Sequence, residues 1–137
     1  TVFWTSKYGS LSAAGYDISV PQAMYDDFVK ISEPIQKIRP DYPFEVKVRE
    51  PRKRPTRMGG TDASVFAIEG VPTLGFTTED FKGYDFDYGE IWHTERDLYT
   101  KNIPEYQEHT ATVTAIIALG VANLDKQLSR EGLYTEE

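Results

Sequence analysis

A strand, a short helix and a second strand follow one another between residues 44 and 76, and this order favours an α/β fold. Residues 44–48 alternate apolar and charged side chains, which is typical of a strand near a sheet edge. Residues 61–70 combine capping residues with helix formers and end in a glycine, and residues 71–76 form a second strand-like run. Such alternation predicts a sheet covered by helices.

Two amphipathic helices are expected to cover this sheet. Apolar residues recur every three or four positions within residues 20–39, where Pro34 is expected to kink or split the helix. A similar stripe predicts a long helix over residues 104–130, in which Lys126 and Arg130 near the last turn suit the helix dipole. Residues 2–5 are interpreted as a short buried strand, and residues 132–137 as a frayed acidic tail.

Composition excludes several classes of partner. The net charge of −7 disfavours binding to nucleic acid, because proteins bind its phosphates through Lys and Arg side chains. It also disfavours binding to anionic membranes. No apolar run approaches the roughly 20 residues that span a bilayer, so no membrane span is expected. The chain has no cysteine, which excludes disulfides, thiolate metal sites and a cysteine nucleophile.

Two connecting segments stand out by composition. Residues 51–57 are basic and rich in proline, and are interpreted either as a solvated loop or as a rim that attracts carboxylates, because arginine can bind a carboxylate through two hydrogen bonds. Residues 77–92 mix aromatic and acidic side chains without periodicity. Long loops are often functional, so this segment is interpreted as a pocket wall, with an insertion packed by its own aromatics as the alternative.

The chain contains two histidines, which differ in their surroundings. His93 follows the aromatic segment and precedes a turn, a place where a functional imidazole is often held. Thr94 and Asp97 are expected to organise this turn, because both residue types bond readily to local backbone groups. His109 lies among polar neighbours and is interpreted as a surface residue. A single histidine is weak evidence for a metal site by itself.

Four short motifs in a fixed order add to this evidence. They are Gly59–Phe66, Glu69–Phe76, Trp92–Asp97 and Ile103–Tyr106. Together they resemble the C-terminal part of the co-catalytic zinc exopeptidases, the family of bacterial leucyl aminopeptidases, aminopeptidase Y and glutamate carboxypeptidases. The resemblance implies an α/β fold, in which the chain forms the C-terminal part of a mixed β-sheet sandwiched by helices, as in the phosphorylase/hydrolase-like zinc exopeptidases.

The same resemblance implies a role for His93 as the last zinc ligand, whose second ring nitrogen is expected to donate to a nearby acidic side chain or backbone carbonyl. In such enzymes the other ligands and the general-base glutamate lie upstream, and two zinc ions activate a water that hydrolyses the peptide bond. Residues 1–137 are therefore expected to be the C-terminal portion of a single zinc peptidase catalytic domain, inactive by itself. Its expected partners are a peptide substrate and the upstream part of that domain, and the isolated chain is expected to self-associate.

The resemblance also implies a substrate-binding surface. Gly59, Gly60 and Thr61 match a segment that lines the pocket of glutamate carboxypeptidases, where small residues let a peptide approach the backbone. Trp92 stands where relatives commonly carry a tyrosine that helps to stabilise the oxyanion, and it offers only an N–H donor. Ala63 replaces a histidine found in many relatives.

Three alternatives to this function remain open. One is a noncatalytic relative of receptor type that binds a peptide or another partner, and another is an enzyme like the glutaminyl cyclases, which share the fold with one zinc ion. A third is an unrelated acidic α/β module whose aromatic loop binds a peptide or sugar. A secreted or periplasmic location is expected from the resemblance.

Overall fold

The computed structural model describes residues 2–4 and 14–135, which form a mixed β-sheet packed with helices. Four strands lie in the order β1-β4-β2-β3: β1 (Val2–Trp4), β2 (Ala14–Val20), β3 (Glu45–Val48) and β4 (Thr73–Glu79). Strand β1 runs parallel to β4, β4 runs antiparallel to β2, and β2 runs parallel to β3. The chain is therefore a small α/β domain, and β3 lies at a sheet edge as predicted.

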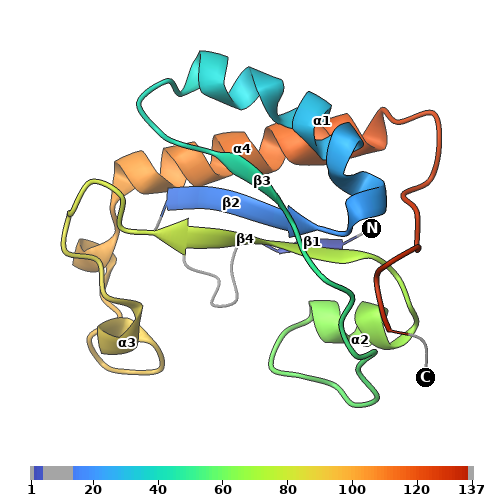
Figure 1. Ribbon diagram of the computed structural model, residues 1–137. Coiled ribbons are helices and arrows are strands. Elements are labelled where there is room, and N and C mark those ends of the chain that lie inside the picture. Colours follow the sequence, from blue (N-terminus) through green and yellow to red (C-terminus); the bar gives the residue numbers. More distant parts are fainter. Residues whose placement is uncertain (1, 5–13, 136–137) are drawn as a thin grey trace.

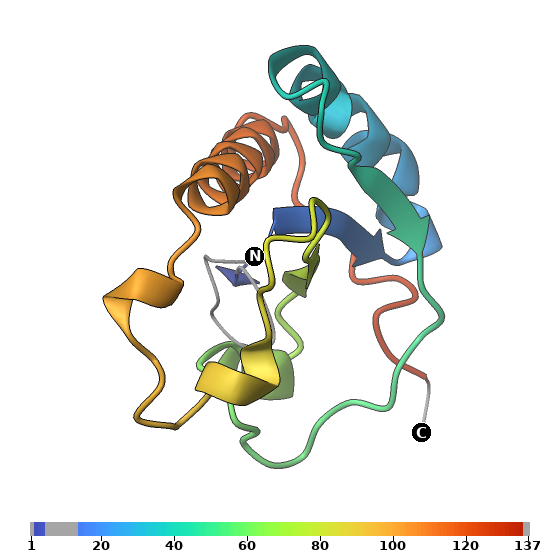
Figure 2. The same cartoon turned by 90° about the vertical axis from the view of Figure 1, so that its left-hand side faces the viewer.

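Helices lie on both sides of this sheet (Figure 1). Helices α1 (Tyr25–Ile38) and α4 (Pro104–Ala122) cover one face, and α2 (Ala63–Ile68) lies beyond the other, as the turned view also shows (Figure 2). The remaining helices are single turns: η1 (Gln22–Met24), α3 (Tyr88–Ile91) and η2 (Tyr99–Lys101). Within the described ranges, no helix is both long enough and apolar enough to cross a membrane.

The hydrophobic core fills the space between the sheet and the layer of α1 and α4. It is built from three strands, both long helices and the C-terminal segment: Ile18, Val20, Met24, Phe28, Ile35, Val46, Leu74, Phe76, Val113, Ile117 and Leu133. The two helices approach closely at Gly120, where an added Cβ would overlap Cγ2 of Ile31 and lie 2.9 Å from its Cγ1. A glycine at this position therefore sets how closely α1 and α4 pack.

Helix α1 runs through Pro34 without a break, so the predicted split is wrong. A proline in a helix removes the hydrogen bond to the carbonyl four residues earlier, which here belongs to Lys30. Both Pro34 and Lys30 are exposed, so water can reach that carbonyl. Ile35, the next residue along the helix, is fully buried and holds the helix against the core.

Strand β2 lies in a segment for which the sequence predicts no element. Ile18 and Val20 are fully buried, and Asp17 between two strands is only 4% exposed. Asp17 accepts a 2.8 Å hydrogen bond from Lys47 Nζ of β3, which compensates for its burial. The sequence of this central strand does not alternate between apolar and polar residues in the way an exposed strand does, because the polar Asp17 is buried as well as its apolar neighbours.

The aromatic segment contains more regular structure than predicted. Strand β4 continues to Glu79, and Tyr88–Ile91 form α3, so the irregular part spans only residues 80–87. The short helix predicted within residues 61–70 is confirmed as the six residues of α2. Its N-cap Asp62 makes no side-chain capping hydrogen bond, contrary to the expected cap.

Helix α4 ends eight residues earlier than predicted. Its C-cap is Asn123, whose N–H donates to Leu119 O at 3.0 Å. Beyond it, Lys126 forms a 2.9 Å ion pair with Asp27 on α1 instead of lying in the last turn of α4. Arg130 also lies outside the helix, so the expected match of these cations to the helix dipole is wrong.

The C-terminal segment is packed, contrary to the predicted frayed tail. Leu133 is 2% exposed and belongs to the core. Tyr134 Oη donates to Ala67 O at 3.1 Å, and Arg52 pairs with Tyr134 in an isolated parallel bridge. Residues 136–137 of the predicted tail, and Thr5 of the first predicted strand, lie outside the described residues.

Candidate metal ligand and substrate pocket

His93 lies on a tight turn directly after α3. Asp87 caps this helix, because its Oδ1 accepts a 2.8 Å hydrogen bond from Gly89 N–H. At the other end Trp92 N–H donates to Tyr88 O at 3.0 Å. His93 then adopts a left-handed conformation with φ of 55°, which is uncommon for residues other than glycine and turns the chain sharply.

Thr94 holds this turn in place. Its Oγ1 lies 2.8 Å from Glu90 O and 3.0 Å from Ile91 O, to which it donates, and it accepts a 3.2 Å hydrogen bond from Arg96 N–H. The prediction that Thr94 organises the turn is therefore confirmed. Asp97 contributes its backbone N–H, which donates to Thr94 O at 3.3 Å.

The imidazole of His93 lies on the surface beside the exposed Trp92 and the half-buried Tyr88. It meets the ring of Trp92 edge to face at 4.6 Å, and Trp92 stacks on Tyr88 at 6.0 Å. Trp92 is 56% exposed. No residue in the described ranges hydrogen-bonds to the His93 ring, so the acceptor expected for its second nitrogen is not supplied by this turn.

A complete metal site is not formed by the residues of the described ranges. Within 2–4 and 14–135, no group of three or more His, Asp or Glu side chains could hold a metal ion. A catalytic zinc needs three protein ligands and an open position. His93 is suited to be one of the three protein ligands, because its imidazole is exposed and its ring nitrogens form no hydrogen bond with the described residues. The remaining ligands would have to come from elsewhere.

A cavity of about 590 Å³ lies between β4, α2 and the basic loop. Its lining comprises Ser19, Arg52, Pro55, Arg57, Gly59, Thr61, Ala63, Ser64, Ala67, Thr73, Gly75, Phe76, Thr77 and Thr78. Guanidinium and hydroxyl groups lie beside apolar surface, a composition suited to a small ligand with a charged end.

The predicted substrate-binding residues separate into two places. Gly59 and Thr61 line this cavity together, whereas Gly60 does not. Trp92 and His93 lie on the turn after α3 and are not part of the lining. Of the segment 77–92, which the sequence predicts to be a pocket wall, Thr77 and Thr78 at the end of β4 line this cavity, whereas residues 80–92 do not.

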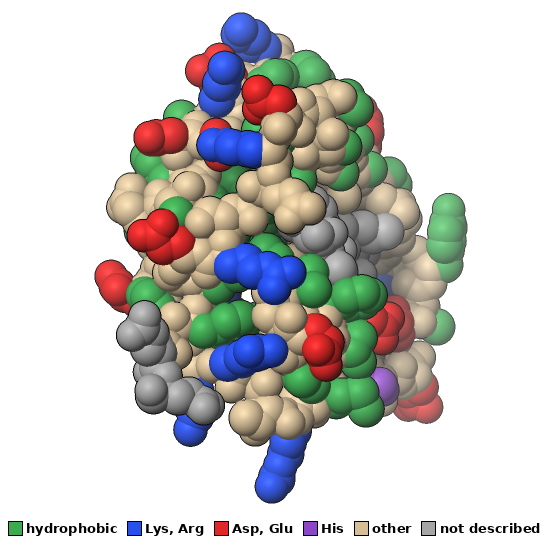
Figure 3. Space-filling model, turned by 90° about the vertical axis from the view of Figure 1, so that its right-hand side faces the viewer, with side chains coloured by type: hydrophobic (Ala, Val, Ile, Leu, Met, Phe, Trp, Pro, Cys, Tyr) green, Lys and Arg blue, Asp and Glu red, His purple; other side chains and the backbone are tan. Residues whose placement is uncertain are grey.

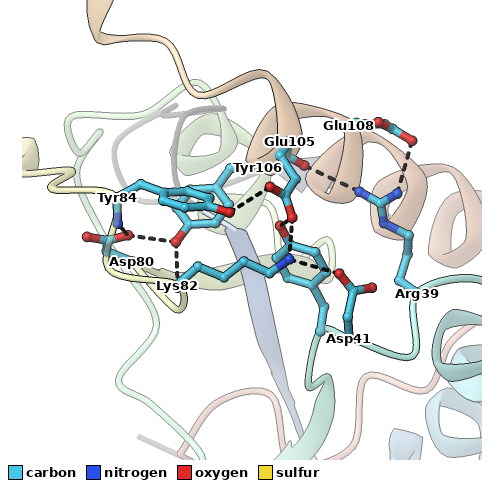
Figure 4. A network of polar contacts seen from close by, with 9 residues as sticks. Arg39, Asp41, Asp80, Lys82, Tyr84, Glu105, Tyr106 and Glu108 are labelled. Carbon is cyan, nitrogen blue, oxygen red and sulfur yellow. Dashed lines mark hydrogen bonds and ion pairs between the residues drawn. The ribbon is translucent and has the colours of Figure 1, made fainter.

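The aromatic segment is instead attached to α4 by a polar network (Figure 4). Lys82 Nζ forms ion pairs with Asp41, at 2.9 Å, and with Glu105 at the start of α4. The Glu105 carboxylate also accepts hydrogen bonds from Tyr42 Oη at 2.6 Å and from Tyr84 Oη at 2.9 Å. Three segments distant in sequence therefore converge on one carboxylate.

A second carboxylate closes the same network. Asp80 accepts hydrogen bonds from Tyr106 Oη at 2.6 Å and from the N–H groups of Tyr84 and Phe86 at 2.9 and 3.2 Å. Tyr106 Oη in turn accepts a 2.6 Å hydrogen bond from the N–H of Lys82. These contacts fold the segment back on itself before it continues to α3 and His93.

The network holds fixed charges at neutral pH. The hydrogen bond from Lys82, with those from Tyr42 and Tyr84, lowers the pKa of Glu105 to about 2. The Glu105 and Asp41 carboxylates raise the pKa of Lys82. Burial, followed by the hydrogen bond to Glu105, raises the pKa of Tyr42. None of these shifts moves a pKa toward 7, where a group can both take up and release a proton at neutral pH. The network therefore positions the segment and is not arranged for proton transfer.

His109 is buried, and its interpretation as a surface residue is wrong. It is fully buried on α4, and its ring stacks on Tyr42 at 4.2 Å with an interplanar angle of 15°. The sequence does contain a signal for this burial, because Tyr106, Thr110 and Val113 are buried at helical spacing on either side. His93 is therefore the exposed imidazole of the two.

The chain was also compared with known proteins. No family model matches it, and neither a curated protein nor a solved structure matches it.

Proposed function

We propose that this chain is the C-terminal portion of a zinc-dependent exopeptidase, of aminopeptidase type, that hydrolyses peptide bonds through a metal-activated water. The observation that carries the proposal is His93, an exposed imidazole on a turn braced by Thr94 and capped by Asp87. A side chain held by a rigid turn is suited to metal ligation, because little freedom is lost on binding.

The order of the sequence motifs supports the same assignment. Gly59–Phe66 leads into α2, Glu69–Phe76 into β4, and Trp92–Asp97 forms the His93 turn before the long closing helix α4. Helices on both faces of a mixed sheet are compatible with the fold of the zinc exopeptidases. The upstream part of the domain would supply the other ligands and the general base, and the isolated chain would be inactive.

Within that enzyme the described residues have limited roles. His93 would hold one of two zinc ions, and the ions would lower the pKa of a bound water and polarise the scissile carbonyl. Gly59 and Thr61 would border the substrate, because both line the cavity beside α2. Trp92 would contribute an exposed aromatic surface next to the ligand.

The proposal is tested on the longest natural form of the protein that contains these residues. We expect about two zinc ions per chain and hydrolysis of an aminoacyl substrate, with activity at least about a hundredfold lower in His93→Ala because a metal ligand is lost. Glu95→Ala, an exposed change two residues away, is the matched control and should retain activity. A protein without metal, in which His93→Ala behaves as the wild type, would contradict the proposal.

A direct test uses the 137-residue chain and its two histidines. Zinc added to the labelled protein should shift or broaden the side-chain NMR signals of His93 and leave those of the buried His109 in place. Equal responses from both imidazoles would show binding without preference and would count against His93 as a ligand. Unchanged signals for His93 up to millimolar zinc would count against it as well.

A further inference from the structure

We propose that the cavity between α2, β4 and the basic loop binds a small ligand carrying a carboxylate, with Arg52 and Arg57 as the groups that recognise it. The proposed hydrolase places its substrate beside Gly59 and Thr61 of this same cavity. Binding of the carboxylate needs neither a metal nor His93, so the two proposals can fail separately. The cavity volume of about 590 Å³ lies within the range of roughly 300–1,000 Å³ common for small-molecule sites.

The two arginines line the cavity with free guanidinium groups. Within the described part of the chain, neither side chain donates a hydrogen bond or forms an ion pair. Arg54, between them in sequence, is by contrast committed, because its Nε donates to Ile68 O at 3.0 Å. Arginine presents paired donors that match the two oxygens of a carboxylate. The cavity therefore has recognition groups that the fold itself does not use.

Positive charge is concentrated around this site in an otherwise acidic protein. Residues 49–57 contain Arg49, Arg52, Lys53, Arg54 and Arg57, against one acid, Glu50. Figure 3 shows Lys and Arg side chains from the top to the bottom of one face, including its centre and lower part, with Asp and Glu side chains among them. Burial, and then the positive charge of Arg52, lower the pKa of Arg49. An anion bound here would relieve this repulsion.

The rest of the lining indicates what the body of the ligand would be. Thr61, Ser64 and Thr77 bring hydroxyl groups, which can hydrogen-bond to an amide. Pro55 and Ala67 bring apolar surface. A ligand with one carboxylate, an amide and an apolar side chain meets all three features, whereas a bare inorganic anion meets only the charge.

The test compares two probes that differ only in charge, N-acetyl-L-leucine and N-acetyl-L-leucinamide. Binding to the 137-residue chain is followed by calorimetry and by NMR shifts of the lining residues. We expect the acid to bind at least about tenfold more tightly, since its carboxylate accepts charge-assisted hydrogen bonds from the guanidinium groups that the neutral amide cannot match. Shifts should occur at Thr61, Ser64 and Thr77. Equal affinity for the two probes would overturn the proposal.

Variants of the loop show whether the two arginines are responsible. Arg52→Gln and Arg57→Gln should each weaken binding of the acid about tenfold, and Arg57→Lys should restore only part of the loss because the paired donors are missing. Lys53→Gln removes the same charge from the same loop outside this lining, and should change affinity less than about twofold. Circular dichroism checks that each variant is folded.

Two results would overturn the assignment even if the acid binds. A loss in Lys53→Gln as large as that in the arginine variants would indicate general attraction by the loop. Displacement of the acid by an equal concentration of inorganic phosphate would indicate a site for any oxyanion, without recognition of the ligand body.

Discussion

Glu105 is the residue on which the polar network depends most. Its folded pKa of about 2 lies below the ordinary value of 4.5, so the folded state favours the ionised carboxylate. Such a group contributes stability that is fully present above pH 4.5 and is lost as the pH falls toward 2. We expect Glu105→Gln to lower the free energy of unfolding at pH 7, and the difference from the wild type to shrink between pH 4.5 and 2. Urea unfolding at several pH values measures this.

Glu108→Gln is the matched control for this prediction. Glu108 lies on the same helix and pairs with Arg39 at 3.0 Å, and its side chain is 70% exposed (Figure 4). An exposed ion pair contributes little to stability, typically about 0–1 kcal/mol. An effect of Glu105→Gln that is no larger than the control, or that does not depend on pH, would contradict the role given to the network.

Single residues were predictable from the sequence where their function is local. Thr94 organises the turn after His93 as expected, because a threonine hydroxyl bonds to nearby backbone groups wherever it stands. Glu105 could not be recognised in this way, because its partners Tyr42, Lys82 and Tyr84 come from two other segments. The same holds for Asp17, which is buried only because Lys47 of the neighbouring strand reaches it.

At the level of elements, the close contact of α1 with α4 depends on Gly120, which has no side chain. A methyl group on Gly120 would overlap Cγ2 of Ile31 and approach its branched Cβ to 3.1 Å, so the helices would have to separate. We expect Gly120→Ala to destabilise the protein by about 1–3 kcal/mol, the usual cost of overpacking, despite the better helix propensity of alanine. Chemical denaturation gives this difference.

A double variant tests the mechanism of that loss. Ile31→Ala removes the atoms that an alanine at position 120 would meet. If overpacking is the cause, Gly120→Ala should be nearly neutral or favourable in the Ile31→Ala background, and the two changes should not be additive. Additive losses would mean that Gly120 is needed for another reason.

Elements with a clear apolar period, an apolar run or capping residues were predictable, and β2, which lacks all three, was not. The periods within residues 20–39 and 104–130 predict α1 and α4, but α4 ends at Ala122, where Asn123 caps it and the chain turns so that Lys126 meets Asp27. Strand β2 has covered polar positions and a register shift between Gly15 and Asp17, which conceal its alternation. The ends of elements and the central strand thus depend on tertiary contacts that no local pattern contains.

At the scale of the whole molecule, the C-terminal segment joins the core to the cavity. Leu133 enters the core between sheet and helices, and its carbonyl accepts a 3.3 Å hydrogen bond from Arg52 N–H. Thr135 N–H donates to Arg52 O at 2.9 Å, and Tyr134 bonds to α2 through Ala67 O. The loop that carries Arg52 is therefore positioned by the last residues of the described chain.

Because of this connection, a change in the C-terminal segment should lower the stability of the protein and also loosen the loop that carries Arg52. We expect Leu133→Ala to lower the free energy of unfolding by about 2–5 kcal/mol, as for other buried leucines, because it leaves a void in the core. Amide exchange at Arg52 and Thr135 should also become faster relative to that in α1, because the segment loses its anchor. Leu119→Ala, at a position 64% exposed on α4, is the matched control and should change neither quantity appreciably. If Leu133→Ala speeds exchange equally in α1 and in the Arg52 loop, the segment stabilises the domain as a whole and does not specifically position the arginines of the cavity.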